Sequence, residues 1–119
     1  MLKREKSHQL YQEIITKTVD YIVDNLHEPL DLKQLAFHAN LSPYHFHRVF
    51  KHIQEETPYN FIRRCRVEKA AQLIRSGEKL FLQQIAYDCG FTNQSMFVKT
   101  FRKYYGVSPH AYRKLNQTK

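Results

Sequence analysis

The sequence predicts an all-α fold of about seven helices, and three observations support this. Apolar residues recur at the three- and four-residue spacing of amphipathic helices, and no segment alternates as a half-buried strand would. Capping residues, three of them followed by proline at the first helical position, precede four segments. Three glycines stand where helices should stop. Together these signals place helices at residues 8–26, 32–39, 43–54, 58–76, 82–89, 93–104 and 109–115.

Local signals set the bounds of these helices in order. The first helix carries Ile15 and Ile22 on one apolar face. Asp31 with Gln34 forms an Asp version of a capping box for the second. The cap-and-proline pairs begin the third, fourth and seventh helices; they are Ser42-Pro43, Thr57-Pro58 and Ser108-Pro109. Phe81 precedes the fifth helix, so we expect that helix to begin raggedly, at a cost of about 1 kcal/mol.

The chain also repeats itself. Residues 32–42 match residues 82–92, fifty positions later, and the segments that follow match after one extra residue in the second copy. The copies differ where their second helices end, because Glu55 occupies the place of Gly106. Two copies of one supersecondary unit account for a chain this short.

Each copy has the layout of a helix-turn-helix motif: a short helix, a tight turn of about three residues and a second helix. The second helix has an apolar stripe that begins at Phe46 in one copy and at Phe97 in the other. The residues that point away from these stripes are Tyr44, Arg48 and Lys51 in the first copy and Ser95, Lys99 and Arg102 in the second. A buried stripe opposite a face that carries basic residues is what a helix that reads a DNA groove requires.

The helix between the two copies sets their spacing. We expect a first helix-turn-helix subdomain at 1–56, a linker helix at 57–76 and a second subdomain at 77–119. A helix over 58–76 would be about 28 Å long. One turn of B-DNA is about 34–36 Å, so both recognition helices could enter successive major-groove segments of a target that need not be palindromic.

The charge of the chain indicates a polyanionic partner. Its 119 residues carry 19 basic and 11 acidic side chains, a formal net charge of +8, and no acidic residue follows Asp88. A polarised basic surface favours nucleic acid. A basic protein with a solvated face would give the same totals, so the charge alone leaves both interpretations open.

Other classes of protein are disfavoured. No apolar run approaches the roughly 18 residues that cross a bilayer, so we expect no membrane partner. Cys65 and Cys89 are too few and too far apart for a disulfide framework or a metal knuckle, which suits a cytoplasmic location. No carboxylate pair, catalytic triad or glycine-rich phosphate loop stands out. His45 and His47 point in different directions, and nothing completes a set of metal ligands with them. We therefore expect no enzyme, no cofactor and no metal site.

The motifs resemble the AraC/XylS-type transcriptional regulators. The matching segments lie within residues 35–51, 61–71 and 85–113, so the resemblance covers nearly the whole chain. It implies two helix-turn-helix subdomains joined by a long helix. The implied activity is sequence-specific binding to double-stranded promoter DNA, usually to activate transcription by contacting RNA polymerase.

The resemblance also implies roles for individual residues. The candidate base contacts are Tyr44, His47, Arg48, Gln94, Ser95 and Lys99. The candidate phosphate contacts are Ser42, Lys51, Arg63, Thr92, Arg102 and Lys103. Arg48 and Lys99 can donate to guanine, and Gln94 can be bidentate to adenine. Arg63, Arg64 and Arg66 cover too much of their helix for all three to face DNA, so at least one should be solvated or form an ion pair within the protein, for example with Glu68.

Several alternatives stay open at this point. Most of the family carries a separate effector or dimerisation domain, so the chain is either a stand-alone regulator or a DNA-binding fragment. We expect it to bind as a monomer to an asymmetric site of about 20 bp. The competing function is a helical protein-interaction module that acts on the transcription machinery without specific DNA binding. RNA binding is a third possibility, but the sequence lacks exposed aromatic platforms on a sheet.

Overall fold

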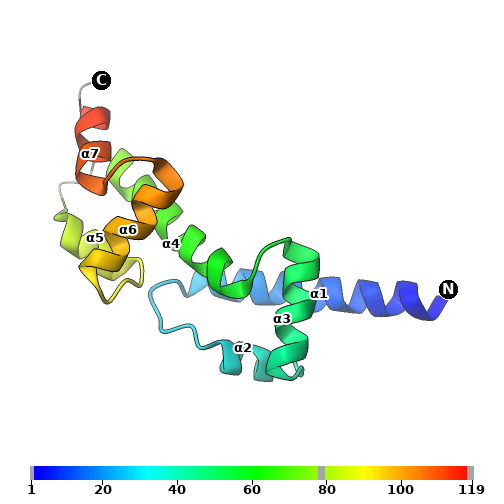
Figure 1. Cartoon of the computed structure of the whole chain (residues 1–119). Coiled ribbons are helices and arrows are strands. Elements are labelled where there is room, and N and C mark those ends of the chain that lie inside the picture. Colours follow the sequence, from blue (N-terminus) through cyan, green and yellow to red (C-terminus); the bar gives the residue numbers. More distant parts are fainter. Residues whose placement is uncertain (1, 78–79, 118–119) are drawn as a thin grey trace. The chain divides into compact units, whose positions relative to one another are not determined.

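Seven helices make up the regular structure of the described residues, which are 2–77 and 80–117 of the computed structural model (Figure 1). This part of the chain contains no strand, as the sequence predicts. The helices are α1 (Leu2–Asp24), α2 (Leu32–His38), α3 (Pro43–Gln54), α4 (Pro58–Arg75), α5 (Leu82–Asp88), α6 (Gln94–Tyr105) and α7 (Pro109–Gln117). None of them is both long and apolar enough to span a membrane.

The predicted helix bounds agree with the structure to within two residues, except at the start of α1. That helix begins at Leu2 instead of His8. The predicted apolar face starts only at Ile15, so it does not fix where the helix begins. Residues 2–6 are good helix formers with no stop signal, so the helix extends through them.

Side-chain caps fix the beginnings of the helices. The hydroxyls of Ser42, Thr57 and Ser108 each accept a hydrogen bond from the backbone N–H three residues later, at 3.1–3.2 Å. The Asp31 carboxylate accepts from the N–H of Lys33 at 2.8 Å, so it caps α2 through the second residue of the helix rather than the third. Phe81 makes no side-chain cap on α5, as expected. The cap of α6 was not predicted: the Asn93 side chain accepts from the Met96 N–H at 3.1 Å.

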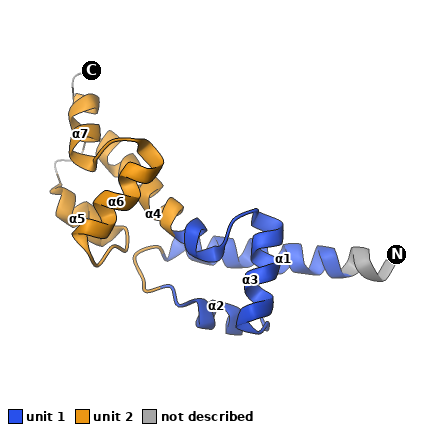
Figure 2. Ribbon diagram, in the orientation of Figure 1, with its two compact units in different colours: residues 1–25, 30–62 blue, residues 26–29, 63–119 orange. Residues whose placement is uncertain are grey.

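The chain forms two compact units (Figure 2). Unit 1 contains residues 1–25 and 30–62, and unit 2 contains residues 26–29 and 63–119. This differs from the predicted division in two places. The linker helix α4 is shared between the units, and the short segment 26–29 belongs to unit 2 although it is flanked by unit 1 in sequence.

Aromatic rings form the centre of unit 1. The ring of Phe50 lies 5.8 Å from that of Phe46 and 5.5 Å from that of Phe61, measured between centroids. Ile15 and Ile22 of α1 are fully buried with them. Ile15 and Ile22 of the predicted α1 face and the predicted face of α3 are therefore buried, whereas Val23 of α1 is 49% exposed.

Unit 2 has an apolar core built from α4, α5 and α6. Phe97 lies 5.2 Å from Phe91 and 5.9 Å from Phe101. Phe101 also contacts Tyr112 of α7 at 5.3 Å. This set of rings joins α6 to α7 and holds the buried face of α6 in place.

Burial raises the pKa of the Cys89 thiol, which lies in this core, to about 11. The unfolded chain loses the thiol proton at lower pH than the folded protein does. The free energy of unfolding is therefore unaffected by this group below the unfolded pKa, and it falls as the pH rises towards about 11. We expect wild type to lose about 2 kcal/mol more stability than Cys89→Ala between pH 9 and pH 11. Urea unfolding of both proteins at several pH values measures the difference. Parallel curves would contradict a buried protonated thiol.

The two helix-turn-helix turns repeat in structure as well as in sequence. In the first, the Leu41 N–H donates to the Ala36 carbonyl at 3.0 Å; in the second, the Phe91 N–H donates to the Ala86 carbonyl at 2.9 Å. These bonds have the spacing of a helix C-cap that ends in a left-handed residue. That residue is Asn40 in one turn and Gly90 in the other, with φ of 58° and 96°.

Glu55 ends α3 in the left-handed conformation, with φ of 62°, where its counterpart Gly106 has φ of 76°. An L side chain is strained there, and a carboxylate at a helix C-terminus opposes the helix dipole. We expect Glu55→Gly to raise the free energy of unfolding by about 0.5–1 kcal/mol in urea. Glu55→Ala removes the charge but keeps the strain, so an equal gain in that variant would contradict the backbone argument.

Candidate nucleic-acid interface

The predicted reading face of α3 is exposed. Tyr44, His47, Arg48 and Lys51 lie at i, i+3, i+4 and i+7, so they form one stripe on the helix, and each is exposed to solvent. Tyr44 is 73% exposed although it is a large aromatic side chain. The opposite side of α3 is buried in the core of unit 1. The structure therefore brings together the three base-contact candidates of the first motif with the phosphate candidate Lys51.

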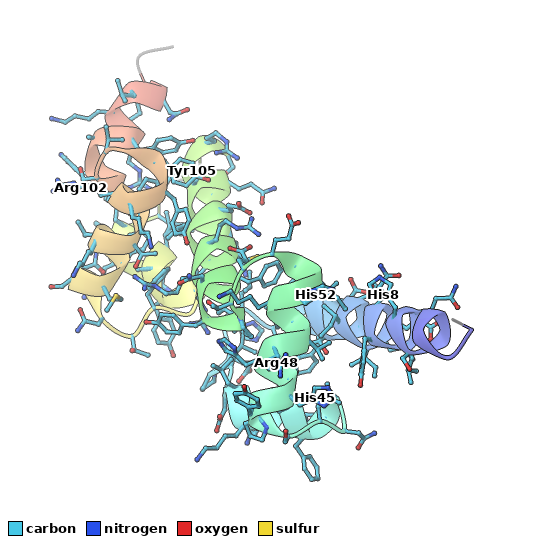
Figure 3. All side chains as sticks on the ribbon, turned by 45° about the vertical axis from the view of Figure 1, so that its right-hand side comes forward. His8, His45, Arg48, His52, Arg102 and Tyr105 are labelled. Carbon is cyan, nitrogen blue, oxygen red and sulfur yellow. The ribbon has the colours of Figure 1, made fainter. Side chains whose placement is uncertain are left out.

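Two contacts order the side chains around this stripe (Figure 3). The guanidinium carbon of Arg48 lies 5.8 Å from the centre of the Tyr44 ring, a distance at which a cation is attracted by the ring face. His45 lies at the side of α3 that meets α1, with its ring 5.5 Å from that of Tyr11. In the described part of the chain, no group of three or more potential ligand side chains is placed to hold a metal ion.

The predicted reading face of α6 is exposed too, and it is hollowed. Gln94, Ser95, Lys99 and Arg102 line a shallow depression of about 400 Å³ together with Val98. Three of these are base-contact candidates and Arg102 is a phosphate candidate. The structure therefore places the predicted contacts of the second motif side by side on one face of α6.

The remaining phosphate candidates lie near the two reading helices, with one exception. Ser42 and Thr92 are exposed in the turns that precede α3 and α6. Lys103 is exposed on α6, with its ammonium 5.6 Å from the centre of the Tyr104 ring. Arg63 is the exception, because it belongs to α4 and is half-buried.

Arg63 contacts α6 from α4. Its guanidinium donates to the Thr100 hydroxyl at 2.7 Å and lies 3.5 Å from the Met96 sulfur. Thr100 is fully buried in the apolar stripe of α6, where the first copy has Val49. A buried hydroxyl needs a hydrogen-bond partner. The presence of Thr100 in the second copy where the first copy has Val49 was therefore the sequence signal that could have predicted this bond. The bond ties the reading helix α6 to α4.

The neighbouring arginines also make contacts within the protein. Arg64 forms an ion pair with Glu68 at 2.8 Å, the pairing within the protein that the sequence suggested for one of the three arginines. Arg66 donates to two backbone carbonyls in the segment 26–29, that of Leu26 at 3.1 Å and that of Glu28 at 2.9 Å. Burial lowers the pKa of the Arg66 guanidinium from its ordinary value.

Gly90, in the turn that leads to α6, packs directly against this arrangement. A Cβ atom on Gly90 would lie 2.1 Å from the Leu26 carbonyl oxygen and 2.7 Å from Nε of Arg66. The turn of the second motif therefore approaches the segment 26–29 too closely for any side chain. Gly90 was predicted as a helix stop, but its close approach to Leu26 and the role of Arg66 were not predicted.

Comparisons with known proteins agree with this geometry. A family model described as a helix-turn-helix domain matches residues 35–115. The multiple antibiotic resistance protein MarA of Escherichia coli K12 is 31% identical over 102 residues, a match that covers 86% of this chain and 80% of MarA. The probable transcriptional regulator LumQ of Photobacterium leiognathi is 36% identical over 94 residues, 79% of this chain. That match covers 38% of LumQ, so the chain spans well under half the length of this relative.

A solved structure gives the same result. The DNA-binding domain of AdpA, a global transcriptional factor crystallised with a target DNA, superposes with a TM-score of 0.84 at 28% identity. The superposition covers 87% of this chain and 93% of that domain. LumQ is named as a probable transcriptional regulator and AdpA as a global transcriptional factor. The chain belongs to the AraC/XylS family of DNA-binding transcriptional regulators.

Proposed function

We propose that this chain binds an asymmetric promoter site of about 20 bp as a monomer, with α3 and α6 in successive major-groove segments. The observation that carries the proposal is the repetition of one exposed reading face. Tyr44, His47 and Arg48 in unit 1 and Gln94, Ser95 and Lys99 in unit 2 are exposed on the second helices of two equivalent motifs. Two different sets of side chains would read two different half-sites, so the target need not be palindromic.

The contacts divide into two kinds. Arg48 and Lys99 have the donors that guanine accepts in the major groove, and Gln94 matches the donor and acceptor of adenine. Lys51, Arg102 and Lys103 lie beside them and suit phosphates, with Ser42 and Thr92 in the turns as further phosphate contacts. Arg63 would contact a phosphate only in addition to its bond to Thr100.

In vitro selection from random duplex DNA tests this proposal. We expect an enriched motif with two dissimilar conserved elements about one helical turn apart, bound by one protein chain per duplex. Band-shift stoichiometry measures the second point. An enriched motif that is palindromic and bound by two chains would contradict the monomer proposal, and the absence of any enriched motif would favour a protein-interaction module instead.

We propose further that the protein activates transcription by contacting RNA polymerase. The AraC/XylS resemblance supports this role. Run-off transcription from a promoter that carries the selected site tests it directly. We expect more transcript when the protein is added, and a decrease would identify a repressor.

A further inference from the structure

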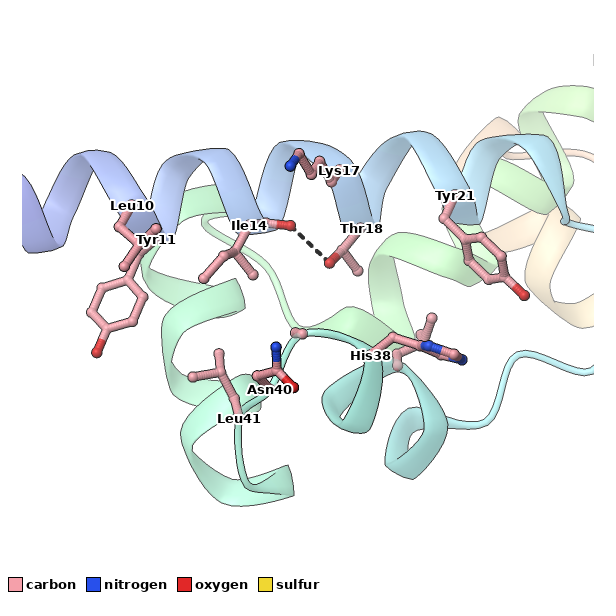
Figure 4. A pocket seen from close by; sticks show the side chains of 11 residues that line it. Leu10, Tyr11, Ile14, Lys17, Thr18, Tyr21, His38, Asn40 and Leu41 are labelled. Atoms are coloured by element: carbon pink, nitrogen blue, oxygen red, sulfur yellow. Dashed lines mark hydrogen bonds between the residues drawn. The ribbon is translucent and has the colours of Figure 1, made fainter.

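A groove on unit 1 has no part in the proposed DNA interface. It lies between α1 and the turn that joins α2 to α3 and has a volume of about 740 Å³ (Figure 4). Leu10, Ile14 and Tyr21 of α1 form one wall, and Leu41 and His38 belong to the other. None of the base-contact candidates on α3 lines it.

The wall of the groove that α1 forms is apolar and open to solvent. Leu10 is 55% exposed and Tyr21 is 49% exposed, whereas Ile15 and Ile22, on the core face of the same helix, are fully buried. The Thr18 hydroxyl donates to the Ile14 carbonyl of its own helix at 2.9 Å. The polar end of this side chain is therefore already bonded, and its methyl group is the apolar part. Exposed apolar side chains that line a groove in this way offer a surface to an apolar partner.

The shape of the groove suits a helix. Its lining residues on α1 recur every three or four positions from Leu10 to Tyr21, a length of about 16 Å or three helical turns. A helix that inserts an apolar stripe into such a groove presents anchors at i, i+3, i+4 and i+7.

The charge beside the groove is acidic. Glu13, Asp20 and Asp24 are exposed and lie on one stripe of α1, at spacings of seven and four residues. Lys17, which lines the groove, lies on the same stripe, so the acidic stripe borders the groove. These three acids and one lysine give residues 7–24 a formal charge of −2, in a chain whose net charge is +8. Such a surface is repelled by DNA phosphates and attracts a positively charged partner.

We propose that this groove docks an amphipathic helix of another protein, with its apolar stripe on Leu10, Ile14 and Tyr21 and basic residues against Glu13, Asp20 and Asp24. The inference goes beyond DNA recognition and does not rest on it. Because the docking surface and the reading faces carry opposite charge, the partner helix and DNA would bind to different parts of the protein.

Two designed peptides of about three helical turns test the proposal with the full chain. Both carry leucine on one face; one carries lysine on the other face and the second carries glutamate. The +8 charge of the protein attracts the glutamate peptide non-specifically, so a preference for the lysine peptide can come only from a local acidic surface. We expect the lysine peptide to bind more tightly by fluorescence anisotropy and to shift the amide resonances of α1 and of residues 38–41.

Variants locate the site. We expect the double change Glu13→Gln and Asp20→Asn, and separately Leu10→Gln, to weaken lysine-peptide binding by about tenfold. The control Glu55→Gln removes an exposed acid that does not line the groove and should leave binding unchanged. Equal or tighter binding of the glutamate peptide, or insensitivity to the groove variants, would overturn the proposal. So would sedimentation that shows a dimer broken by Leu10→Gln, because the groove would then hold a second copy of the chain.

Discussion

Replacing Gly90 with alanine is expected to lower the free energy of unfolding of unit 2 by about 3–4 kcal/mol. Two costs add at this position. The backbone has φ of 96°, which L residues rarely adopt, and the new Cβ would lie 2.1 Å from the Leu26 carbonyl oxygen. The oxygen belongs to backbone that Arg66 holds with two hydrogen bonds, so it cannot move without breaking them. A loss of this size is a large part of the stability of a small protein.

Gly106→Ala is the matched control for this change. Gly106 also has a positive φ, of 76°, but a Cβ there would meet nothing within 4 Å. Only the backbone strain remains, so we expect a loss of about 1 kcal/mol. Urea unfolding followed by circular dichroism measures both variants. If they were destabilised equally, the close packing of the second turn against the segment 26–29 would be refuted.

Replacing Arg48 with alanine is expected to weaken binding to the selected DNA by about 1–3 kcal/mol and to relax the preference at one base pair. The guanidinium supplies two donors in a fixed fork, and the exposed Tyr44 ring beside it limits its freedom. Arg48→Lys keeps the charge but not the fork, so it should retain most of the affinity for non-specific DNA and lose the base preference. Band shifts on the selected duplex and on its single-base variants measure both effects.

Arg102→Ala is the comparison for this prediction. Arg102 is exposed at the edge of the α6 depression, where we expect a phosphate contact. Its loss should weaken binding to every sequence by a similar factor and lower the slope of log affinity against log salt by about 1. If the Arg48 and Arg102 variants lost affinity equally on all sequences, the division between base and phosphate contacts would be wrong.

The parts of the fold that depend on nearby residues were predictable from the sequence. A capping hydroxyl followed by proline fixes a helix start within a few residues, and so α3 and α4 begin where predicted. The exposed and buried faces of α3 and α6 follow from helical periodicity in the same way. The start of α1 was not predicted correctly, because no side chain at that end signals where the helix should begin.

The parts that depend on distant residues were not predictable. Arg63 bonds to Thr100, 37 positions away, and Arg66 bonds to Leu26, 40 positions away. An arginine in a basic helix has the same local pattern whether it binds DNA or a carbonyl group of its own chain. For this reason the bond of Arg63 to Thr100 and the association of segment 26–29 with unit 2 were not predicted.

Sequence-specific recognition by two different reading faces is the central claim, and a competition measurement with the full chain tests it most directly. The affinity for the selected duplex is compared, at about 0.15 M salt, with that for duplexes in which one or both groove segments are scrambled. We predict that scrambling both segments weakens binding by about a thousandfold or more, and that scrambling either one gives an intermediate loss. Equal affinity for all four duplexes would contradict specific recognition, and a loss from only one segment would contradict the use of both helices.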